Sequence, residues 1–253
     1  MKLFCRTYGR GEPLVILHGF LGCSDNWHTL AGRLGGRFRV LVPDLRNHGR
    51  SPHASGFGIP ELAGDIRRLL DDHGIGRAAL LGHSLGGKAA MRLALDAPER
   101  IERIAVADIA PRAYPPRTFP EVDAMLALDR ATLASRADAD AALAAAVPDA
   151  AVRGLLLKNL ERGDDGRLRW RCNLAALARH AARILEPVDG PPFPGPALFL
   201  RGGRSDYVTD ADLPAIRRLF PRAESAIIPG AGHWLHADAP DAVLEQLLRF
   251  LGE

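Results

Sequence analysis

Short runs of apolar residues that end in turn-forming residues recur along the chain. Such near-continuous runs are typical of strands that helices cover on both faces, because both sides of the strand are then buried. They predict a mostly parallel sheet. Six runs are expected to be its strands: residues 13–19, 38–44, 78–84, 101–108, 196–203 and 223–230.

Between these runs, apolar positions recur every three to four residues. In residues 60–74 they form one stripe through Leu62, Ile66 and Leu69, and residues 241–252 repeat the pattern. This spacing is typical of amphipathic helices with one buried face. The alternation of strand and helix indicates an α/β fold, with helices on both faces of a twisted sheet.

Residues 110–190 break the alternation. Two proline-rich passages, APRAYPPRTFP and GPPFPGP, enclose helix-forming stretches such as EVDAMLALDRATLA, DAALAAAV and AAVRGLLLKNLERG. Long insertions in compact domains usually serve a site. We therefore expect residues 110–190 to form a small helical cap, or lid, on a core made of residues 1–109 and 191–253; surface decoration is the alternative.

Composition supports an ordinary globular protein. Of 253 residues, 47% are hydrophobic and 25% are charged, which argues against a disordered chain. The 33 basic and 30 acidic side chains leave a net charge of only +3 and are scattered. No basic patch indicates nucleic-acid binding.

The cysteines and the first residues bear on cofactors and location. Cys5, Cys23 and Cys172 lack zinc-ligand spacing and are expected to be reduced thiols, and no metal or organic cofactor is expected. Arg6 and Arg10 come too early for a signal peptide, and no apolar run approaches membrane-spanning length. The sequence thus predicts a cytoplasmic protein without membrane insertion, either a monomer or a dimer.

The stretch GHSLG, residues 82–86, follows a predicted strand and precedes a predicted helix. It matches G-x-S-x-G, the turn that exposes a nucleophilic serine, here Ser84. The same stretch nearly matches a phosphate-binding loop through Lys88, but Ala89 stands where a magnesium-binding hydroxyl is needed. Nucleotide binding therefore remains a remote alternative. Gly87 is expected to bring the helix close to the sheet, and Lys88 to be an ordinary helical residue.

Two backbone amides are candidates for an oxyanion hole. The amide of Leu85 follows the serine at the start of a helix, where the dipole favours an anion. The amide of Phe20 follows an early strand in LHGFLGCSDNW, where His18 and Gly19 allow a tight turn. Two such donors stabilise the charge that develops during acyl transfer.

A serine nucleophile also needs a base and an orienting carboxylate. His233 lies after the last predicted strand, where Gly230 and Gly232 favour an exposed turn, so it is preferred over His236. Two aspartates fit the order serine, acid, histidine. They are Asp108, which ends the predicted strand 101–108, and Asp206, which follows the predicted strand 196–203, and chain order alone does not choose between them.

Seven segments spread over nearly the whole chain together resemble the YbfF-like and ABHD11-like esterases of the α/β-hydrolase superfamily. The segments are LHGFLGCSDNW, VPDLRNHGRSPH, LLGHSLGGKAAM, VADIAP, RWRCNL, GGRSDYV and GAGHWLHADAP. The resemblance implies an eight-stranded hydrolase sheet with a small helical cap. It also implies an esterase or thioesterase that acts on small acyl esters, with acyl-CoA as one candidate substrate.

The same resemblance bears on the acid. It implies that the DIAP segment carries the acid, which favours Asp108 as the partner of His233 and Ser205 as a supporting hydrogen bonder; this sequence departs from the pattern by also having Asp206. In DLRNHGRS, which also belongs to the resemblance, Arg46, Asn47 and His48 are expected to fix the loop beside the nucleophile turn. No reactive role is expected for Asp44, because it precedes the serine in the chain.

The expected reaction is acyl transfer to Ser84, with His233 moving the proton and water releasing the acid. Seven residues are expected to lie against the substrate: His18, Gly19, His83, Met125, Leu126, Leu156 and Trp170. For the four of these that belong to the cap, packing inside the cap is the alternative. Other interpretations keep the fold and change the role. They are C–C bond hydrolysis, perhydrolysis or a lyase step with the same triad, or a binding module without catalysis.

Overall fold

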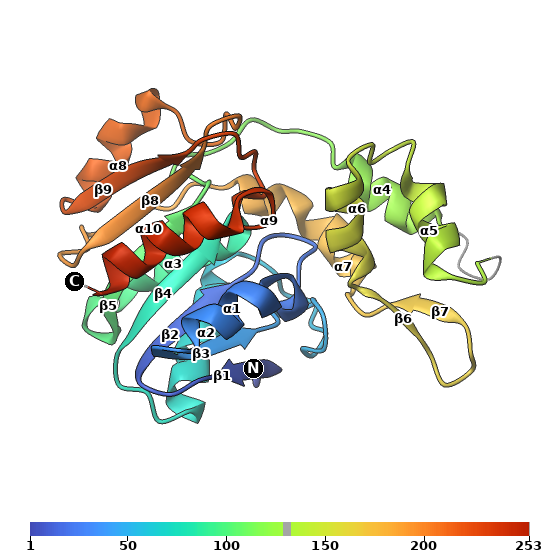
Figure 1. Ribbon diagram of the computed structural model, residues 1–253, viewed down its shortest axis with the longest axis horizontal. Helices are drawn as coiled ribbons and strands as arrows, with labels where there is room; N and C mark the ends of the chain where they lie inside the picture. The colour runs from blue at the N-terminus through green and yellow to red at the C-terminus, as the bar shows by residue number, and fades with distance from the viewer. Residues whose placement is uncertain (129–132, 253) are drawn as a thin grey trace.

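The computed structural model describes residues 1–128 and 133–252. Its main sheet has seven strands in the order β1-β3-β2-β4-β5-β8-β9, and only β1 runs antiparallel to its neighbour (Figure 1). The strands are β1 (Cys5–Tyr8), β2 (Glu12–Leu17), β3 (Phe38–Pro43), β4 (Ala78–His83), β5 (Ile101–Ala107), β8 (Ala197–Gly202) and β9 (Ala223–Ile228).

The six predicted strands are therefore confirmed as β2, β3, β4, β5, β8 and β9. The expectation of eight strands is wrong for the described residues, because β1 alone lies beyond β3 at that edge of the sheet. The sequence did not reveal β1. Its four residues, CRTY, include two polar side chains and form no apolar run.

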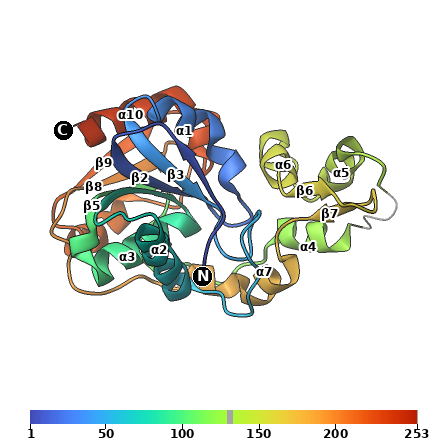
Figure 2. The same ribbon diagram turned by 90° about the horizontal axis from the view of Figure 1, so that it is seen from below.

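Helices cover both faces of the sheet, so the core has three layers (Figures 1 and 2). One face packs against α1 (His28–Leu34) and α10 (Pro240–Gly252), and the other against α2 (Ile59–Asp72), α3 (Leu85–Asp96) and α8 (Leu213–Leu219). Successive residues of β2 alternate between the two sides. Leu14 and Ile16 join the α1 and α10 side, whereas Val15 and Leu17 join the other. This alternation is the two-residue period of a strand buried on both faces.

Residues 110–190 lie beside the core, at the end of the sheet where the parallel strands finish (Figure 1). Their described part contains four α-helices and a two-stranded hairpin: α4 (Pro120–Ala127), α5 (Arg136–Leu143), α6 (Ala150–Leu157), β6 (Leu160–Arg162), β7 (Leu168–Trp170) and α7 (Leu174–His180). A short helix, α9 (Leu235–Asp238), precedes α10. Four 3-10 turns complete the elements of the residues that the structure describes: Ser24–Trp27, Pro98–Arg100, Ala181–Leu185 and Asp210–Asp212.

The helical stretches expected within residues 110–190 are shorter than predicted. The stretch 121–134 forms α4, and residues 129–132 lie outside the described part of the chain. The stretch 150–163 forms α6 only as far as Leu157, because Leu160 already pairs with Trp170 in the hairpin. No helix in the described residues combines the length and apolar character needed to cross a bilayer.

Lys88 is not the ordinary helical residue that was expected. It lies on α3 with no exposed surface. Its ammonium group donates hydrogen bonds to the carbonyl oxygens of Glu186 and, at 3.3 Å, Arg112, and it lies 4.9 Å from the ring centre of Tyr114. Arg112 and Glu186 belong to the two chain segments that connect residues 110–190 to the core. Lys88 thus ties both connections to the nucleophile helix.

Burial, helped by the charge of Arg112, lowers the pKa of Lys88 from 10.5 to about 7. Between these values the unfolded chain carries a proton that the native chain does not, so the native state gains stability as the pH rises. We expect the unfolding free energy of the wild type, minus that of Lys88→Met, to rise by about 1 kcal/mol per pH unit from pH 7.5 to 9.5. Urea titrations at each pH measure this difference.

The exposed Lys2 provides the control, because Lys2→Met should leave the difference from wild type constant over the same pH range. A flat difference for Lys88→Met would contradict the lowered pKa.

Candidate active site

Ser84 occupies a sterically constrained turn between β4 and α3. Its backbone has φ 51° and ψ −117°, a conformation that residues other than glycine rarely adopt. A Cβ atom at Gly82 would lie 2.3 Å from the carbonyl oxygen of Gly86, and one at Gly86 would lie 2.5 Å from that of Leu17. At Gly87 it would lie 2.6 Å from the side chain of Ile109, which confirms that this glycine lets the helix pack closely.

Three predicted residues form a continuous hydrogen-bonded chain. The hydroxyl oxygen of Ser84 lies 3.1 Å from His233 Nε2, and His233 Nδ1 lies 2.8 Å from Asp108 Oδ2. Asp108 has no exposed surface and also accepts hydrogen bonds from the Gly202 amide, at 2.9 Å, and from the Ser205 hydroxyl. These donors keep the buried carboxylate satisfied, as a buried charge requires.

Asp206 takes no part in this chain. Its side chain is exposed and borders a separate hollow lined by Arg112, Tyr114 and Tyr207. Of the two aspartates that chain order left open, Asp108 is the one whose carboxylate lies within hydrogen-bond distance of His233.

Tyr207 is a neighbour of His233 that sequence reasoning missed. Its ring stacks on the imidazole with centres 3.8 Å apart and planes 17° apart. The hydroxyl of Tyr114 donates a 2.6 Å hydrogen bond to the Tyr207 carbonyl and accepts one from the Ala110 amide at 2.8 Å. The only signal in the sequence was an aromatic residue just after Ser205 and Asp206.

Two further histidines lie close by. His83 Nε2 is 2.8 Å from the carbonyl oxygen of His233, and burial, with the nearby His233, holds the pKa of His83 well below its usual value. A neutral His83 therefore donates this bond and anchors the backbone that carries His233. His236, the rejected competitor, is buried and stacks on Trp27 with ring centres 4.1 Å apart. Burial lowers the pKa of His236 to about 3, so it is a neutral packing group.

The two proposed oxyanion amides come from different elements. Leu85 is the first residue of α3, so its N–H has no acceptor within the helix. Phe20 lies in the loop after β2 and lines the cavity at Ser84. A Cβ atom at Gly19 would lie 3.4 Å from Ser84 Cβ. The loop backbone therefore passes directly beside the nucleophile.

His18 and His48 fix the loop after β2 through hydrogen bonds of their buried rings. His18 Nε2 accepts a hydrogen bond from the Leu45 amide at 2.9 Å, and His48 Nε2 accepts one from the Leu21 amide at 3.2 Å. Both rings are buried. Burial lowers the pKa of His18, and burial together with His18 lowers the pKa of His48 to about 3. The expectation that His18 lies against the substrate is therefore wrong, because its ring is committed to the loop.

The loop that follows β3 is structural in the same way. Asp44 is buried and accepts hydrogen bonds from the amides of Ser24, at 2.6 Å, and Arg50, at 2.8 Å. Arg46 pairs with Asp65 at 2.6 Å. Asp44 thus holds two neighbouring loops together.

A cavity of about 320 Å³ opens at Ser84, between the core and residues 110–190. Of the expected wall residues in that segment, Leu156 lines it. The lining residues that sequence reasoning missed are Leu21, Arg117, Glu121, Ala146, Val147, Pro148, Asp149, Val152, Ile184, Tyr207 and Trp234.

The other three expected wall residues lie elsewhere. Met125 and Trp170 are buried within the segment, where the indole N–H donates to the Met125 carbonyl at 3.0 Å, and Leu126 is 49% exposed. The expectation for these three is wrong. The turn of α4 and the pairing of the hairpin direct Met125 and Trp170 into the segment's own interior.

Comparison with known proteins identifies the family of the chain. A model of the alpha/beta hydrolase family matches residues 14–246. The chain is 40% identical to the sn-1-specific diacylglycerol lipase ABHD11 of Xenopus laevis, over 95% of this chain and 80% of that protein. It is 36% identical to the esterase YbfF of Escherichia coli (strain K12), over 96% of this chain and 94% of that protein.

A solved structure described as a marine microorganism esterase superimposes with a TM-score of 0.94 at 38% identity, covering 98% of this chain and 99% of that one. The resemblance drawn from the sequence is thus confirmed. The chain belongs to the alpha/beta hydrolase family, and within it to the hydrolases that cleave ester bonds.

Proposed function

We propose that the protein hydrolyses carboxylic esters and thioesters through an acyl-enzyme on Ser84. The observation that carries this proposal is the chain of contacts from Ser84 through His233 to Asp108, at 3.1 and 2.8 Å. A serine hydroxyl is a weak nucleophile until an adjacent base removes its proton. The distances place such a base, and a carboxylate to orient it, within hydrogen-bond reach.

The first half of the reaction forms the acyl-enzyme. Ser84 Oγ attacks the acyl carbonyl while His233 Nε2 takes its proton, and Asp108 holds the imidazole in the productive tautomer and stabilises the imidazolium. Negative charge then develops on the carbonyl oxygen, where the amides of Phe20 and Leu85 would bind it. Collapse of this intermediate expels the alcohol or thiol, which receives the proton from His233.

The second half releases the acid. Water attacks the acyl-enzyme, His233 accepts one proton from that water, and the same proton returns to Ser84 Oγ as the carboxylic acid leaves. Every proton is thus moved by His233. The stacked ring of Tyr207 limits the rotation of the imidazole between the two half-reactions and offers its face to the imidazolium.

The cavity indicates how a substrate would lie. Its apolar walls, including Val147, Val152, Leu156 and Ile184, suit an acyl chain, and the charged side chains of Arg117, Glu121 and Asp149 suit a polar leaving group. We propose that residues 110–190 act as a cap that supplies these walls to a core of residues 1–109 and 191–253. Acyl-CoA is one thioester that this proposal includes.

Ser84→Ala is expected to lower kcat on p-nitrophenyl butyrate and on butyryl-CoA by about 10⁶-fold, because loss of the nucleophile removes the covalent route. Steady-state assays with both substrates measure this. Ser225 on β9 is exposed, so Ser225→Ala serves as the control and should retain full activity. Wild-type rates in Ser84→Ala would rule out the proposed nucleophile.

Asp108→Asn is expected to reduce kcat by about 10⁴-fold, since an amide favours the wrong tautomer of the histidine. Asp206→Asn should stay within about twofold of the wild type, because its side chain is exposed. Parallel kcat measurements, with circular dichroism to check folding, test the pair. The reverse ranking would show that Asp206 is the orienting acid.

A further inference from the structure

We infer that Asn159, from residues 110–190, is a positioning residue for the oxyanion loop of the core, an inference that rests on the proposed function. Asn159 Nδ2 donates a 2.7 Å hydrogen bond to the carbonyl oxygen of Leu21. The side chain has no exposed surface. Leu21 directly follows Phe20, whose amide is one of the two proposed oxyanion donors.

Leu21 needs external support to keep its conformation. Its φ of 58° lies in the left-handed region, which is unfavourable for a leucine. Its amide donates to His48 Nε2 at 3.2 Å, and its carbonyl accepts from Asn159. The backbone N–H of Leu21 is therefore bound by the core, and its backbone carbonyl by residues 110–190. Without the second bond, the backbone beside Phe20 is free to relax.

Asn159 is itself fixed to the elements that shape the cavity. Its amide donates to the carbonyl of Leu156 at 2.9 Å, and its carbonyl accepts from the Arg171 amide at 2.8 Å. Leu156 lines the cavity at Ser84. The end of α6, the hairpin and the oxyanion loop therefore meet at one residue, whose backbone bonds to the first two and whose side chain bonds to the third.

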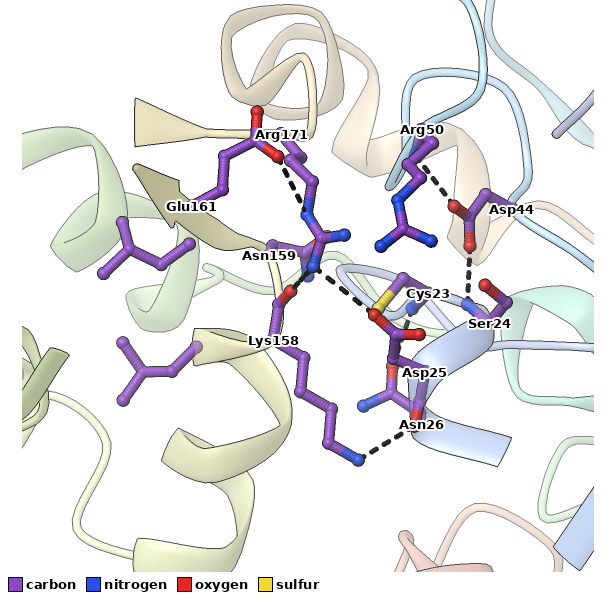
Figure 3. Close-up of polar contacts among 12 residues, drawn as sticks. Cys23, Ser24, Asp25, Asn26, Asp44, Arg50, Lys158, Asn159, Glu161 and Arg171 are labelled. Carbon is purple, nitrogen blue, oxygen red and sulfur yellow. Dashed lines mark hydrogen bonds and ion pairs between the residues drawn. The ribbon is translucent and has the colours of Figure 1, made fainter. Parts of the chain in front are cut away.

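Neighbouring contacts in the same interface offer a matched control. Lys158 Nζ donates to the Asp25 carbonyl at 3.0 Å, and the Arg171 guanidinium lies 3.5 Å from the Asp25 carboxylate (Figure 3). These contacts also join residues 110–190 to the core. They bind Asp25, which is further along the loop than Leu21, so they should hold the segments together without setting the Phe20 amide.

The test compares Asn159→Ala with Lys158→Met in the full-length protein. With p-nitrophenyl butyrate, Asn159→Ala is expected to lower kcat by about 10- to 100-fold and leave KM within about twofold. The reason is that a displaced oxyanion donor weakens binding of the transition state but not binding of the substrate. Lys158→Met should change neither value by more than about twofold. Asn159→Ser has a side chain too short to reach Leu21, so its kcat and KM are expected to match those of Asn159→Ala. It replaces Asn159→Ala in the comparison if that variant does not fold.

A second readout separates positioning from loosened packing. A trifluoromethyl ketone forms an adduct with Ser84 whose oxyanion occupies the same hole, so its affinity should fall by the same factor as kcat/KM. An unchanged kcat in the Asn159 variants, or a raised KM with unchanged ketone affinity, would overturn the inference. A wild-type enzyme that neither cleaves the ester nor binds the ketone would instead refute the proposed function.

Discussion

The constraint on which the site depends is the left-handed backbone of Ser84, held between β4 and α3 by the close approach of Gly82 and Gly86 to neighbouring carbonyls. This turn places the hydroxyl beyond the end of the sheet and the Leu85 amide at the start of a helix. Asp108 also has a positive φ, of 53°, at the end of β5. Two unfavourable backbone positions thus face His233 from adjacent strands, and the packed core on both sides of the sheet holds them there.

Strand order explains how residues so distant in sequence converge. Strands β4, β5, β8 and β9 are consecutive neighbours in the sheet and run parallel, so their carboxyl ends share one edge. The loops after them carry, in turn, Ser84, Asp108, Ser205 and His233. Residues 110–190 leave the core after β5 and return before β8, which sets them over the same edge. Lys88 on the nucleophile helix bonds to both ends of residues 110–190, at Arg112 and Glu186. Tyr114, near the first of these ends, bonds to Tyr207.

Much of this could be predicted from the sequence, because apolar runs mark buried strands and the serine turn has a distinctive pattern. Chain order left the choice between Asp108 and Asp206 open, since both follow strands; the family resemblance favoured Asp108, and the 2.8 Å contact with His233 agrees with it. Contacts across residues 110–190 were beyond reach. Met125 and Trp170 turn inward, Lys88 is buried by chain segments distant in sequence, and Asn159 bonds to a residue 138 positions away. Periodicity reports which face of a helix is apolar, not which element covers it.

The most direct test of the account is rapid-quench mass spectrometry of the intact protein during turnover of an ester. The account predicts a species heavier by one acyl group, with the acyl group on the peptide that contains Ser84, and its decay should match the rate of acid release. Turnover with Ser84 unmodified, or with the acyl group on another residue such as Cys23, would contradict it.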